Sequence, residues 1–304
     1  MNTELDNIQL ANTKQDNPLV SVVMSFHNSQ YTLARSIQSL LWQTFPYWEL
    51  ILLNDGSNDD SAQILDLFKD PRIRLFGDSL CHGLPVRLNQ GIALARGKYI
   101  ARMDADDIAF PQRFARQVAY LQDHPEIDLL ATAALLVNAN DQPMGLLPAG
   151  QSHVDICNRP WHGFSMPHPT WMGRTDWFRK NPYDELAIKA QDQALLYRTY
   201  RTSCFAGLPD VLLGYRYDGL SARKTLVARY HFLRVLAMSG VWKHLLAGAI
   251  GHGIAAVRDL ASIALYMSSR VISVRAQSVD RQVLIEWEKL RMLLANYADK
   301  TGDK

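Results

Sequence analysis

The fold of this chain follows from eleven residues, GKYIARMDADD, which run from Gly97 to Asp107. The first half is apolar in the manner of a strand that other elements cover, and Gly97 supplies the turn that enters it. The second half holds three acidic residues within four positions, at the point where that strand ends. We therefore predict a buried strand that delivers three carboxylates to one edge of a sheet.

The three carboxylates are those of Asp104, Asp106 and Asp107. Like charges repel, and burying them unpaired is costly, so a cation is expected beside them. Oxygen ligands suit a hard divalent ion, and we interpret the Asp104-x-Asp106 pair as a site for Mg²⁺ or Mn²⁺, completed by water and substrate phosphates. The alternative is a solvated acidic turn that caps the next helix, and the triplet alone does not decide between the two.

Apolar runs and helical periodicities alternate along the first hundred residues. The predicted strands are 19–24, 48–53, 72–76 and 99–103, and the predicted helices are 31–43, 62–68 and 84–95. This alternation predicts an α/β fold with a mostly parallel sheet and helices on both faces. Ligands of such sheets lie beyond the carboxyl ends of the strands. Polar clusters follow three of those ends, at 25–28, 54–57 and 104–107, and indicate a nucleotide site there.

Other classes of protein lack support in the sequence. The 304 residues are 48% hydrophobic and 20% charged, which is ordinary globular composition with ample length for a core. No G-x-G-x-x-G follows the first strand and no phosphate-binding G-x-x-x-x-G-K-[ST] is present, which argues against a dinucleotide fold and a P-loop.

The three cysteines, Cys81, Cys157 and Cys204, are far apart, so we expect reduced thiols rather than a zinc site or redox pair.

Three segments in the same order resemble the GT-A fold glycosyltransferases of family 2. They are residues 20–24, Asn54-Asp55-Gly56-Ser57, and residues 99–107. The resemblance extends over roughly residues 18–220, and its specificity comes from the agreement of several motifs. Two departures lie on the nucleotide side, because the family usually has Pro at the position of Ser25 and Asp at that of Asn54. They leave the choice of base open.

The resemblance implies a nucleotide-sugar donor. Asp55 is then expected to accept a hydrogen bond from the base or ribose, with a helix cap near Ser61 as its alternative. Asp106 is expected to bind the metal that bridges the diphosphate, and Asp104 to face the ribose or a metal-bound water. Asp107 is either a third acidic ligand or a cap of the helix beginning near Pro111. The other donor-binding candidates are Ser25, Asn28, Ser57 and Arg216.

The same resemblance indicates the catalytic base. The family has Glu-Asp before an apolar helix, whereas this chain has Gln191 followed by the retained Asp192. Asp192 is expected to deprotonate the acceptor hydroxyl, whose direct attack inverts the anomeric centre. The alternative is a helix cap at Asp192. His168 is expected to touch phosphate or acceptor or to serve as a structural hydrogen-bonding residue, and Trp171 to stack on a sugar or to belong to the core.

The last 84 residues differ from the rest. Residues 221–304 hold 13 Lys or Arg and 6 Asp or Glu, whereas residues 1–220 hold 19 and 24. Helices are predicted at 226–238 and 283–297, and residues 244–257 form an uncharged run that is too short to span a bilayer. We expect this basic region to lie on an anionic membrane surface, with a helical cap on the catalytic domain or an oligomer contact as alternatives.

These observations combine into one functional prediction. Residues 1–17 form a flexible leader, 18–220 the catalytic domain and 221–304 a helical appendage. The protein is expected in the cytoplasm, peripherally at the inner face of the cell membrane. Its expected reaction is the transfer of a sugar to a saccharide or lipid-linked acceptor in surface polysaccharide synthesis. No nucleic-acid partner is expected. A nucleotidyltransferase is one alternative, although residues 25–30 lack its basic, glycine-rich phosphate loop. A non-catalytic carbohydrate-binding relative is the other, although it would tolerate loss of Asp106 or Asp192, and both are present.

Overall fold

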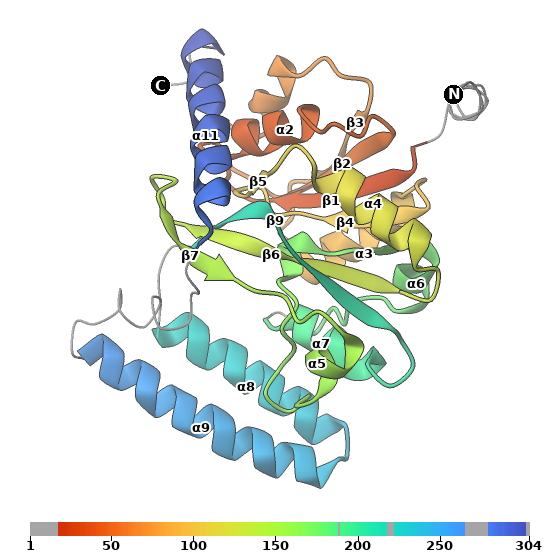
Figure 1. Cartoon of the computed structure of the whole chain (residues 1–304), viewed down its shortest axis with the longest axis vertical. Helices are drawn as coiled ribbons and strands as arrows, with labels where there is room; N and C mark the ends of the chain where they lie inside the picture. The colour runs from red at the N-terminus through yellow and green to blue at the C-terminus, as the bar shows by residue number, and fades with distance from the viewer. Residues whose placement is uncertain (1–17, 188, 218–221, 265–278, 302–304) are drawn as a thin grey trace.

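A mixed nine-stranded sheet forms the centre of the molecule (Figure 1). The computed structural model describes residues 18–187, 189–217, 222–264 and 279–301, so the predicted leader at 1–17 lies outside the described residues. The strand order is β3-β2-β1-β4-β8-β6-β9-β5, with β7 paired to β6. Helices cover both faces of this sheet, as the sequence predicted.

The amino-terminal half of the sheet is parallel, as predicted. Its strands are β1 (Val20–Phe26), β2 (Trp48–Asp55), β3 (Ile73–Asp78) and β4 (Tyr99–Arg102). The connecting helices are α2 (Leu33–Leu41), the 3₁₀ helix η1 (Gln63–Leu67) and α3 (Leu84–Leu94). Alternate residues of each strand enter two separate apolar clusters, one on either face. Gly91 lets α3 approach closely, because a Cβ there would lie 2.4 Å from Cγ1 of Val23.

The second half of the sheet is not parallel throughout. Its strands are β5 (Ile108–Ala109), β6 (Leu129–Val137), β7 (Pro143–Leu147), β8 (Met172–Arg174) and β9 (Phe205–Arg216). The helices between them are α4 (Arg113–Asp123), α5 (His153–Cys157), the 3₁₀ helix η2 (His168–Thr170), α6 (Thr175–Lys180) and α7 (Gln191–Thr199). Strands β6 and β9 are parallel, whereas β8 is antiparallel to both β4 and β6. Antiparallel pairing needs no helical crossover, and the β6–β7 hairpin turns tightly through residues 138–142.

Two groups of helices follow the sheet. Helices α8 (Ala222–Met238) and α9 (Trp242–Ala264) lie side by side below α7 in Figure 1, and α11 (Arg281–Thr301) lies beside α2. The helices predicted at 226–238 and 283–297 are therefore present, whereas the predicted domain boundary at 220/221 lies outside the described residues.

Helix α11 completes the core around the end of β9. The Trp287 side chain is only 1% exposed, and its indole N–H donates to the carbonyl of Asp141 at 2.8 Å. Gly214 on β9 makes room for this ring, since a Cβ there would lie 2.2 Å from Trp287 Cζ3. This part of the carboxyl-terminal region is thus packed on the sheet as a structural cap.

Candidate active site

Three carboxylates gather at the carboxyl end of β4. Oxygen atoms of Asp104, Asp106 and Asp107 all lie within 4.8 Å of one another. Asp107 is fully buried; its Oδ1 accepts the backbone N–H of Arg216 at 3.0 Å, and its Oδ2 has no hydrogen-bond partner. Burial, followed by the charge of Asp104, raises the pKa of Asp106 to about 6, and burial also raises the pKa of Asp107. The three carboxylates repel one another, and a divalent cation fits their oxygen ligands.

Two buried arginines stand beside the cluster. Arg102 pairs with Asp104 through Nη1 and Oδ2 at 2.6 Å. Arg113 is fully buried and donates to the carbonyls of Arg102 and Pro169 at 2.7 and 2.9 Å. Burial lowers the pKa of Arg113 to about 9, with Arg102 acting in the same direction. Because Arg102 already neutralises Asp104, the uncompensated negative charge is concentrated on the other two carboxylates.

Divalent-metal binding at this cluster should weaken as the pH falls below about 6. A proton on Asp106 competes with the metal, and its folded-state pKa of about 6 means that the carboxylate is mostly protonated at pH 5. We expect Mn²⁺ affinity, measured by calorimetry, to be at least about tenfold lower at pH 5 than at pH 7.5. Equal affinities at the two pH values would contradict the assignment of Asp106 as a ligand.

A cavity of about 370 Å³ opens in front of the cluster. Ser25, Asn28, Asp104, Asp106 and Arg216 are among the residues that line it. We call it the donor cavity. It lies where the carboxyl ends of β1, β4 and β9 meet, which is the edge that the sequence indicated.

Arg216 joins the end of β9 to the β6–β7 turn and to the loop after β4. Its guanidinium donates to the Asp141 carboxylate at 2.6 Å and to the carbonyls of Ala139 and Asp106 at 2.8 and 3.1 Å. A guanidinium has five N–H donors, and most of these are already used here. The arrangement favours a structural ion pair with Asp141 over the predicted contact of Arg216 with the donor.

Asn28 and Ser57 join the loops after β1 and β2. Asn28 adopts a left-handed backbone with φ of 51°, its N–H donates to Ser57 Oγ at 3.1 Å, and its Oδ1 accepts from the N–H of Asn58 at 2.9 Å. The N–H of Ser57 donates to Oδ1 of Asn54 at 2.9 Å. Asn28 lines the donor cavity and Ser57 does not, so Ser57 supports the rim through Asn28.

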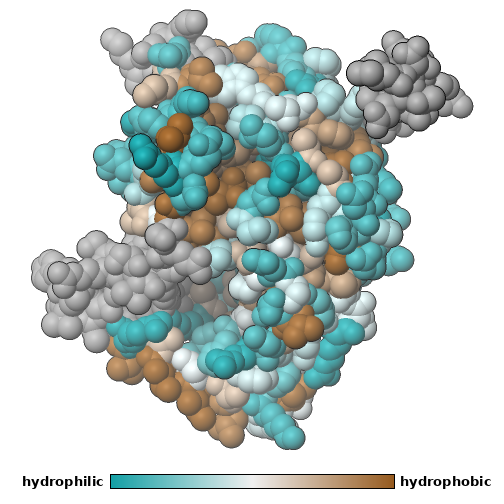
Figure 2. All heavy atoms as spheres, viewed as in Figure 1, coloured by the Kyte–Doolittle hydropathy of each residue, from teal (hydrophilic) through white to brown (hydrophobic). Residues whose placement is uncertain are grey.

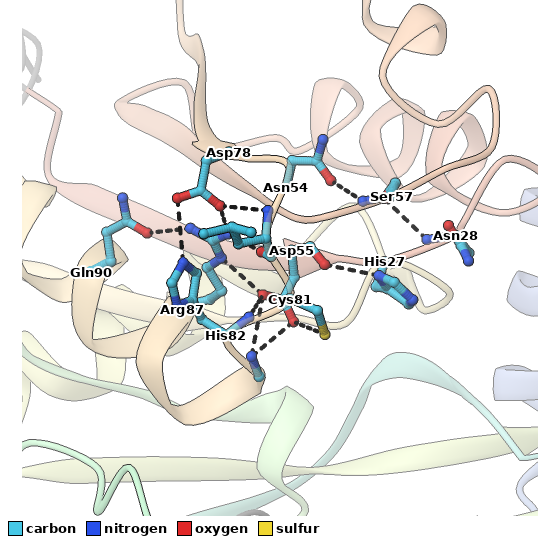
Figure 3. A network of polar contacts seen from close by, with 12 residues as sticks. His27, Asn28, Asn54, Asp55, Ser57, Asp78, Cys81, His82, Arg87 and Gln90 are labelled. Atoms are coloured by element: carbon cyan, nitrogen blue, oxygen red, sulfur yellow. Dashed lines mark hydrogen bonds and ion pairs between the residues drawn. The ribbon is translucent and has the colours of Figure 1, made fainter.

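Asp55 faces the protein rather than the donor cavity (Figure 3). Its carboxylate accepts from the N–H groups of His82 and Gly83 at 2.8 and 3.1 Å and from Arg87 Nε at 3.0 Å. Burial acts to raise the pKa of Asp55, but these hydrogen bonds outweigh it, and the pKa lies below its ordinary value. Nor does Asp55 cap the helix near Ser61. Its contact with a base or ribose remains a prediction, while the structure gives it the role of anchoring residues 81–87.

A second cavity, of about 430 Å³, surrounds Asp192. We call it the acceptor cavity; His168, Gln193 and Tyr215 are among its lining residues. Asp192 lies in the first turn of α7, where Nε2 of Gln193 donates to its Oδ2 at 3.2 Å. The N-cap position belongs to Ala190, so Asp192 is not the cap that the sequence allowed as an alternative. Gln191 opens the helix and does not line this cavity.

The two cavities lie near each other along the chain of β9. Tyr215 lines the acceptor cavity and its neighbour Arg216 the donor cavity. Burial raises the pKa of the Tyr183 hydroxyl, and the charges of both Asp192 and Asp104 act in the same direction. Both carboxylates therefore lie close enough to act electrostatically on one hydroxyl group.

His168 and Trp171 have structural partners. Nε2 of His168 lies 2.8 Å from the Tyr183 hydroxyl, and burial followed by the charge of Arg102 lowers the pKa of His168 well below its usual value. His168 still lines the acceptor cavity. Trp171 is 0% exposed, and its indole donates to the carbonyl of Met166 at 3.2 Å. The expectation that Trp171 stacks on a sugar is therefore wrong, because both ring faces are covered by protein.

Several residues of the site were missed by sequence reasoning: Arg87, Arg102, Arg113, Tyr183 and Tyr215. Arg102 left a signal, since an arginine inside an apolar strand must find a carboxylate or carbonyl partner. No pattern in the sequence identified the other four residues, because contacts such as those of Arg87 with Asp55 and of Arg113 with Pro169 join residues that are remote in sequence.

The comparison with known proteins agrees with this geometry. The profile of glycosyl transferase family 2 matches residues 21–181, which is more than half of the chain. The chain belongs to glycosyl transferase family 2. This membership agrees with the resemblance that the motifs of the sequence indicated.

Curated relatives of this family 2 chain carry the same kind of name. The putative glycosyltransferase EpsE of Bacillus subtilis is 39% identical over 39% of this chain and 44% of EpsE. The uncharacterized glycosyltransferase MJ1057 of Methanocaldococcus jannaschii is 29% identical over 76% of this chain and 82% of that protein. The Escherichia coli protein WfgD, a UDP-Glc:alpha-D-GlcNAc-diphosphoundecaprenol beta-1,3-glucosyltransferase, is 33% identical over 35% of this chain and 42% of WfgD. The aligned part spans less than half the length of EpsE and WfgD.

Solved structures share the fold. Staphylococcus aureus TarS in complex with UDP aligns with a TM-score of 0.57 and 18% identity, over 71% of this chain and 64% of that one. The mannosyltransferase PcManGT of Pyrobaculum calidifontis, in complex with GDP-Man and Mn²⁺, aligns with a TM-score of 0.58 and 14% identity, over 99% and 90%. These similarities concern the fold and confirm that this family 2 member has the predicted GT-A architecture.

Proposed function

We propose that the protein catalyses an inverting, divalent-metal-dependent transfer of a sugar from a nucleotide-sugar donor to an acceptor hydroxyl. The observation that carries this proposal is the donor cavity with its acidic cluster next to a second cavity lined by Asp192. The donor class is supported by neighbours of the same fold that hold UDP-GlcNAc and GDP-Man.

The donor is held at the carboxyl end of β4. Asp104 and Asp106, which line the donor cavity, would hold Mg²⁺ or Mn²⁺ with the buried Asp107 beside them. When bound, the ion would offset the negative charge on the departing diphosphate, an effect worth several kcal/mol. Asn28 and Ser25 contribute polar groups to the same wall. Because the loops around Asn28 are tied to one another by hydrogen bonds, this wall is preorganised.

Asp192 acts as the general base. It would accept the proton of the acceptor hydroxyl as that oxygen attacks the anomeric carbon, and attack from the face opposite the diphosphate inverts that centre. The geometry supports this role because Gln193 donates to Oδ2 of Asp192, which orients the carboxylate and leaves Oδ1 for the hydroxyl. General-base assistance is worth about 10²–10⁴-fold in rate.

The acceptor is a saccharide or lipid-linked saccharide of surface polysaccharide synthesis. WfgD and WfaP, two relatives from Escherichia coli, act by name on a diphosphoundecaprenol-linked sugar. A binding-only relative would have no need of a carboxylate placed as Asp192 is, so catalysis is the function we favour.

A screen of nucleotide sugars tests the proposal. In the presence of Mn²⁺, a true donor at 100 times its Kd should stabilise the protein by about 2.7 kcal/mol, which corresponds to an increase in Tm of about 4 °C for a chain of this length. Nucleoside triphosphates and free sugars serve as controls. Stabilisation by a triphosphate alone, with none by any nucleotide sugar, would favour a nucleotidyltransferase and overturn the proposal.

We further propose that α9 lies on an anionic membrane surface. An exposed apolar stripe runs along this helix, where Figure 2 shows hydrophobic side chains at the lower edge of the molecule. Its members are Trp242 (78% exposed), Leu246 (66%), Ile250 (58%), Ile254 (68%) and Val257 (69%). From 222 to 264 the chain has six Lys or Arg and one Asp. Among the described helices, none is long and apolar enough to span a membrane, which favours an interfacial position.

The triple variant Leu246→Gln/Ile250→Gln/Ile254→Gln should lose membrane binding. Full burial of such a side chain is worth about 1.5–3 kcal/mol, and partial burial in the membrane interface about 1 kcal/mol, so the loss of three should lower the partition onto anionic liposomes on the order of 100-fold. Flotation in a density gradient measures it. The control is Met292→Gln/Leu293→Gln, which changes two similarly exposed side chains on α11. Flotation that survives the triple change, or that fails equally in the control, would contradict the role of this stripe.

A further inference from the structure

A third cavity, of about 560 Å³, lies between the α8–α9 pair and the segment 162–165. We call it the basic cavity. It shares Phe164, Ser165 and Gln193 with the acceptor cavity, so the two are contiguous. Gln193 forms the partition: its Oε1 accepts the N–H of Phe164 at 2.8 Å, and its Nε2 donates to Asp192. A molecule that fills both cavities would therefore pass directly beside the proposed base.

The titratable groups that line the basic cavity can carry positive charge but not negative charge. They are His162, Arg229 and His252, and none of the described residues that line it is acidic. The ring of His252 is hydrogen-bonded to the backbone of Trp161, whereas its Nε2 is buried and has no hydrogen-bond partner. Such a nitrogen is costly to bury and is ready to engage a polar group of a ligand.

Glycines shape this cavity. Gly251 on α9 lets the His162 ring lie against the helix, since a Cβ there would be 2.1 Å from Cε1 of His162. Gly163 has a left-handed φ of 100°, and a Cβ there would be 2.9 Å from Oε1 of Gln193. Both the approach of the helix and the turn of the loop thus depend on missing side chains.

We propose that the basic cavity binds the diphosphate of a prenyl-diphosphate-linked saccharide, so that the saccharide reaches Asp192 while the prenyl chain leaves toward the apolar stripe of α9. This inference rests on the proposed function and names its acceptor class. An arginine guanidinium, and a histidine ring once it is protonated, form charge-assisted hydrogen bonds with phosphate oxygens. The basic cavity is contiguous with the cavity of Asp192, and α9, which lines the basic cavity through Gly251, His252 and Ala255, also carries the apolar stripe. This arrangement suits a molecule with a saccharide, a diphosphate and a lipid.

Calorimetry with three probes tests the site in EDTA, without metal or nucleotide. Farnesyl diphosphate should bind the wild-type protein, whereas farnesol and inorganic pyrophosphate should each bind at least tenfold more weakly. Farnesol binding as tightly as farnesyl diphosphate would reduce the cavity to an apolar groove and overturn the proposal. Pyrophosphate binding as tightly would identify a free-anion site and overturn the lipid-linked assignment.

The variant His162→Asn/His252→Asn should weaken farnesyl diphosphate binding at least tenfold. The control is His231→Asn on α8, which changes a histidine outside the lining of the basic cavity. Perturbation of the His162 and His252 ring resonances in NMR spectra on titration shows direct contact rather than a folding effect, and melting curves of all variants check the fold. Unchanged affinity in the double variant, with a normal melting curve, would overturn the proposal.

The donor screen separates this inference from the function on which it rests. If farnesyl diphosphate binds and the double variant weakens it, but no nucleotide sugar stabilises the protein, the cavity stands and the transferase proposal fails. If nucleotide sugars bind and farnesyl diphosphate does not, the transferase stands and the lipid-diphosphate site fails. With a lipid-linked acceptor, the double variant should act mainly by raising KM, about tenfold or more.

Discussion

Asp192→Asn should reduce sugar transfer by about 10²–10⁴-fold while leaving donor binding close to the wild-type value. Asparagine keeps the size and the hydrogen-bond acceptor of the side chain but cannot take up the acceptor proton. Asp192 lines the acceptor cavity and not the donor cavity, so the metal-dependent donor contacts should remain. Steady-state kinetics with the donor identified by the screen, together with calorimetry of donor binding, give the two quantities.

A matched control variant separates the loss of the general base from the loss of a negative charge at the amino terminus of a helix. Asp176 lies in the first turn of α6, as Asp192 does in α7, and it is exposed and outside the acceptor cavity. Asp176→Asn loses the same favourable interaction with the helix dipole, worth about 0.3–1 kcal/mol, and should retain activity. Wild-type turnover in Asp192→Asn would remove this residue as the base.

Asp106→Asn should abolish metal-dependent donor binding and, in the absence of metal, make the protein more stable. The ionised Asp106 is unfavourable in the fold: burial and Asp104 raise its pKa from 3.8 to about 6. A carboxylate with a raised folded-state pKa binds its proton more tightly in the folded than in the unfolded state, so stability is lost as pH rises from about 4 to about 6. At pH 7.5 the neutral asparagine should therefore stabilise the metal-free protein by about 1–3 kcal/mol.

Two measurements on this variant move in opposite directions. Chemical denaturation in EDTA should give a higher free energy of unfolding than wild type, whereas calorimetry with nucleotide sugar and Mn²⁺ should show at least a 100-fold loss of affinity. Asp60→Asn is the control, since Asp60 is an exposed carboxylate in the loop after β2 that does not line the donor cavity. Unchanged Mn²⁺-dependent donor binding in Asp106→Asn would contradict the metal site, whatever the stability result.

The position of the acidic cluster could be predicted because it depends on local sequence. The apolar run of β4 forms a parallel strand, and parallel strands bring their carboxyl ends to one edge. Asp106 therefore had to lie beside the loop after β1. The family resemblance, rather than the strand pattern, predicted α7 and placed Asp192 at its start.

The direction in which polar side chains point could not be predicted. Asp55 follows a strand as Asp104 does, yet it turns inward because Arg87 and the backbone of residues 82–83 supply its donors. The sequence was equally compatible with an Arg216 that binds phosphate, but in the structure its guanidinium pairs with Asp141, 75 residues earlier. Such partners are set by packing between distant segments, which no local pattern encodes.

Sequence by itself therefore determined the α/β alternation, the edge of the sheet that carries the chemistry, and the charge of the carboxyl-terminal helices, since periodicity and composition act over a few turns of chain. Only the tertiary structure decided that Trp287 on α11 closes the core, that Trp171 is buried, and that the basic cavity opens into the one around Asp192. The physical reason is that burial and hydrogen-bond satisfaction depend on which segments meet in space.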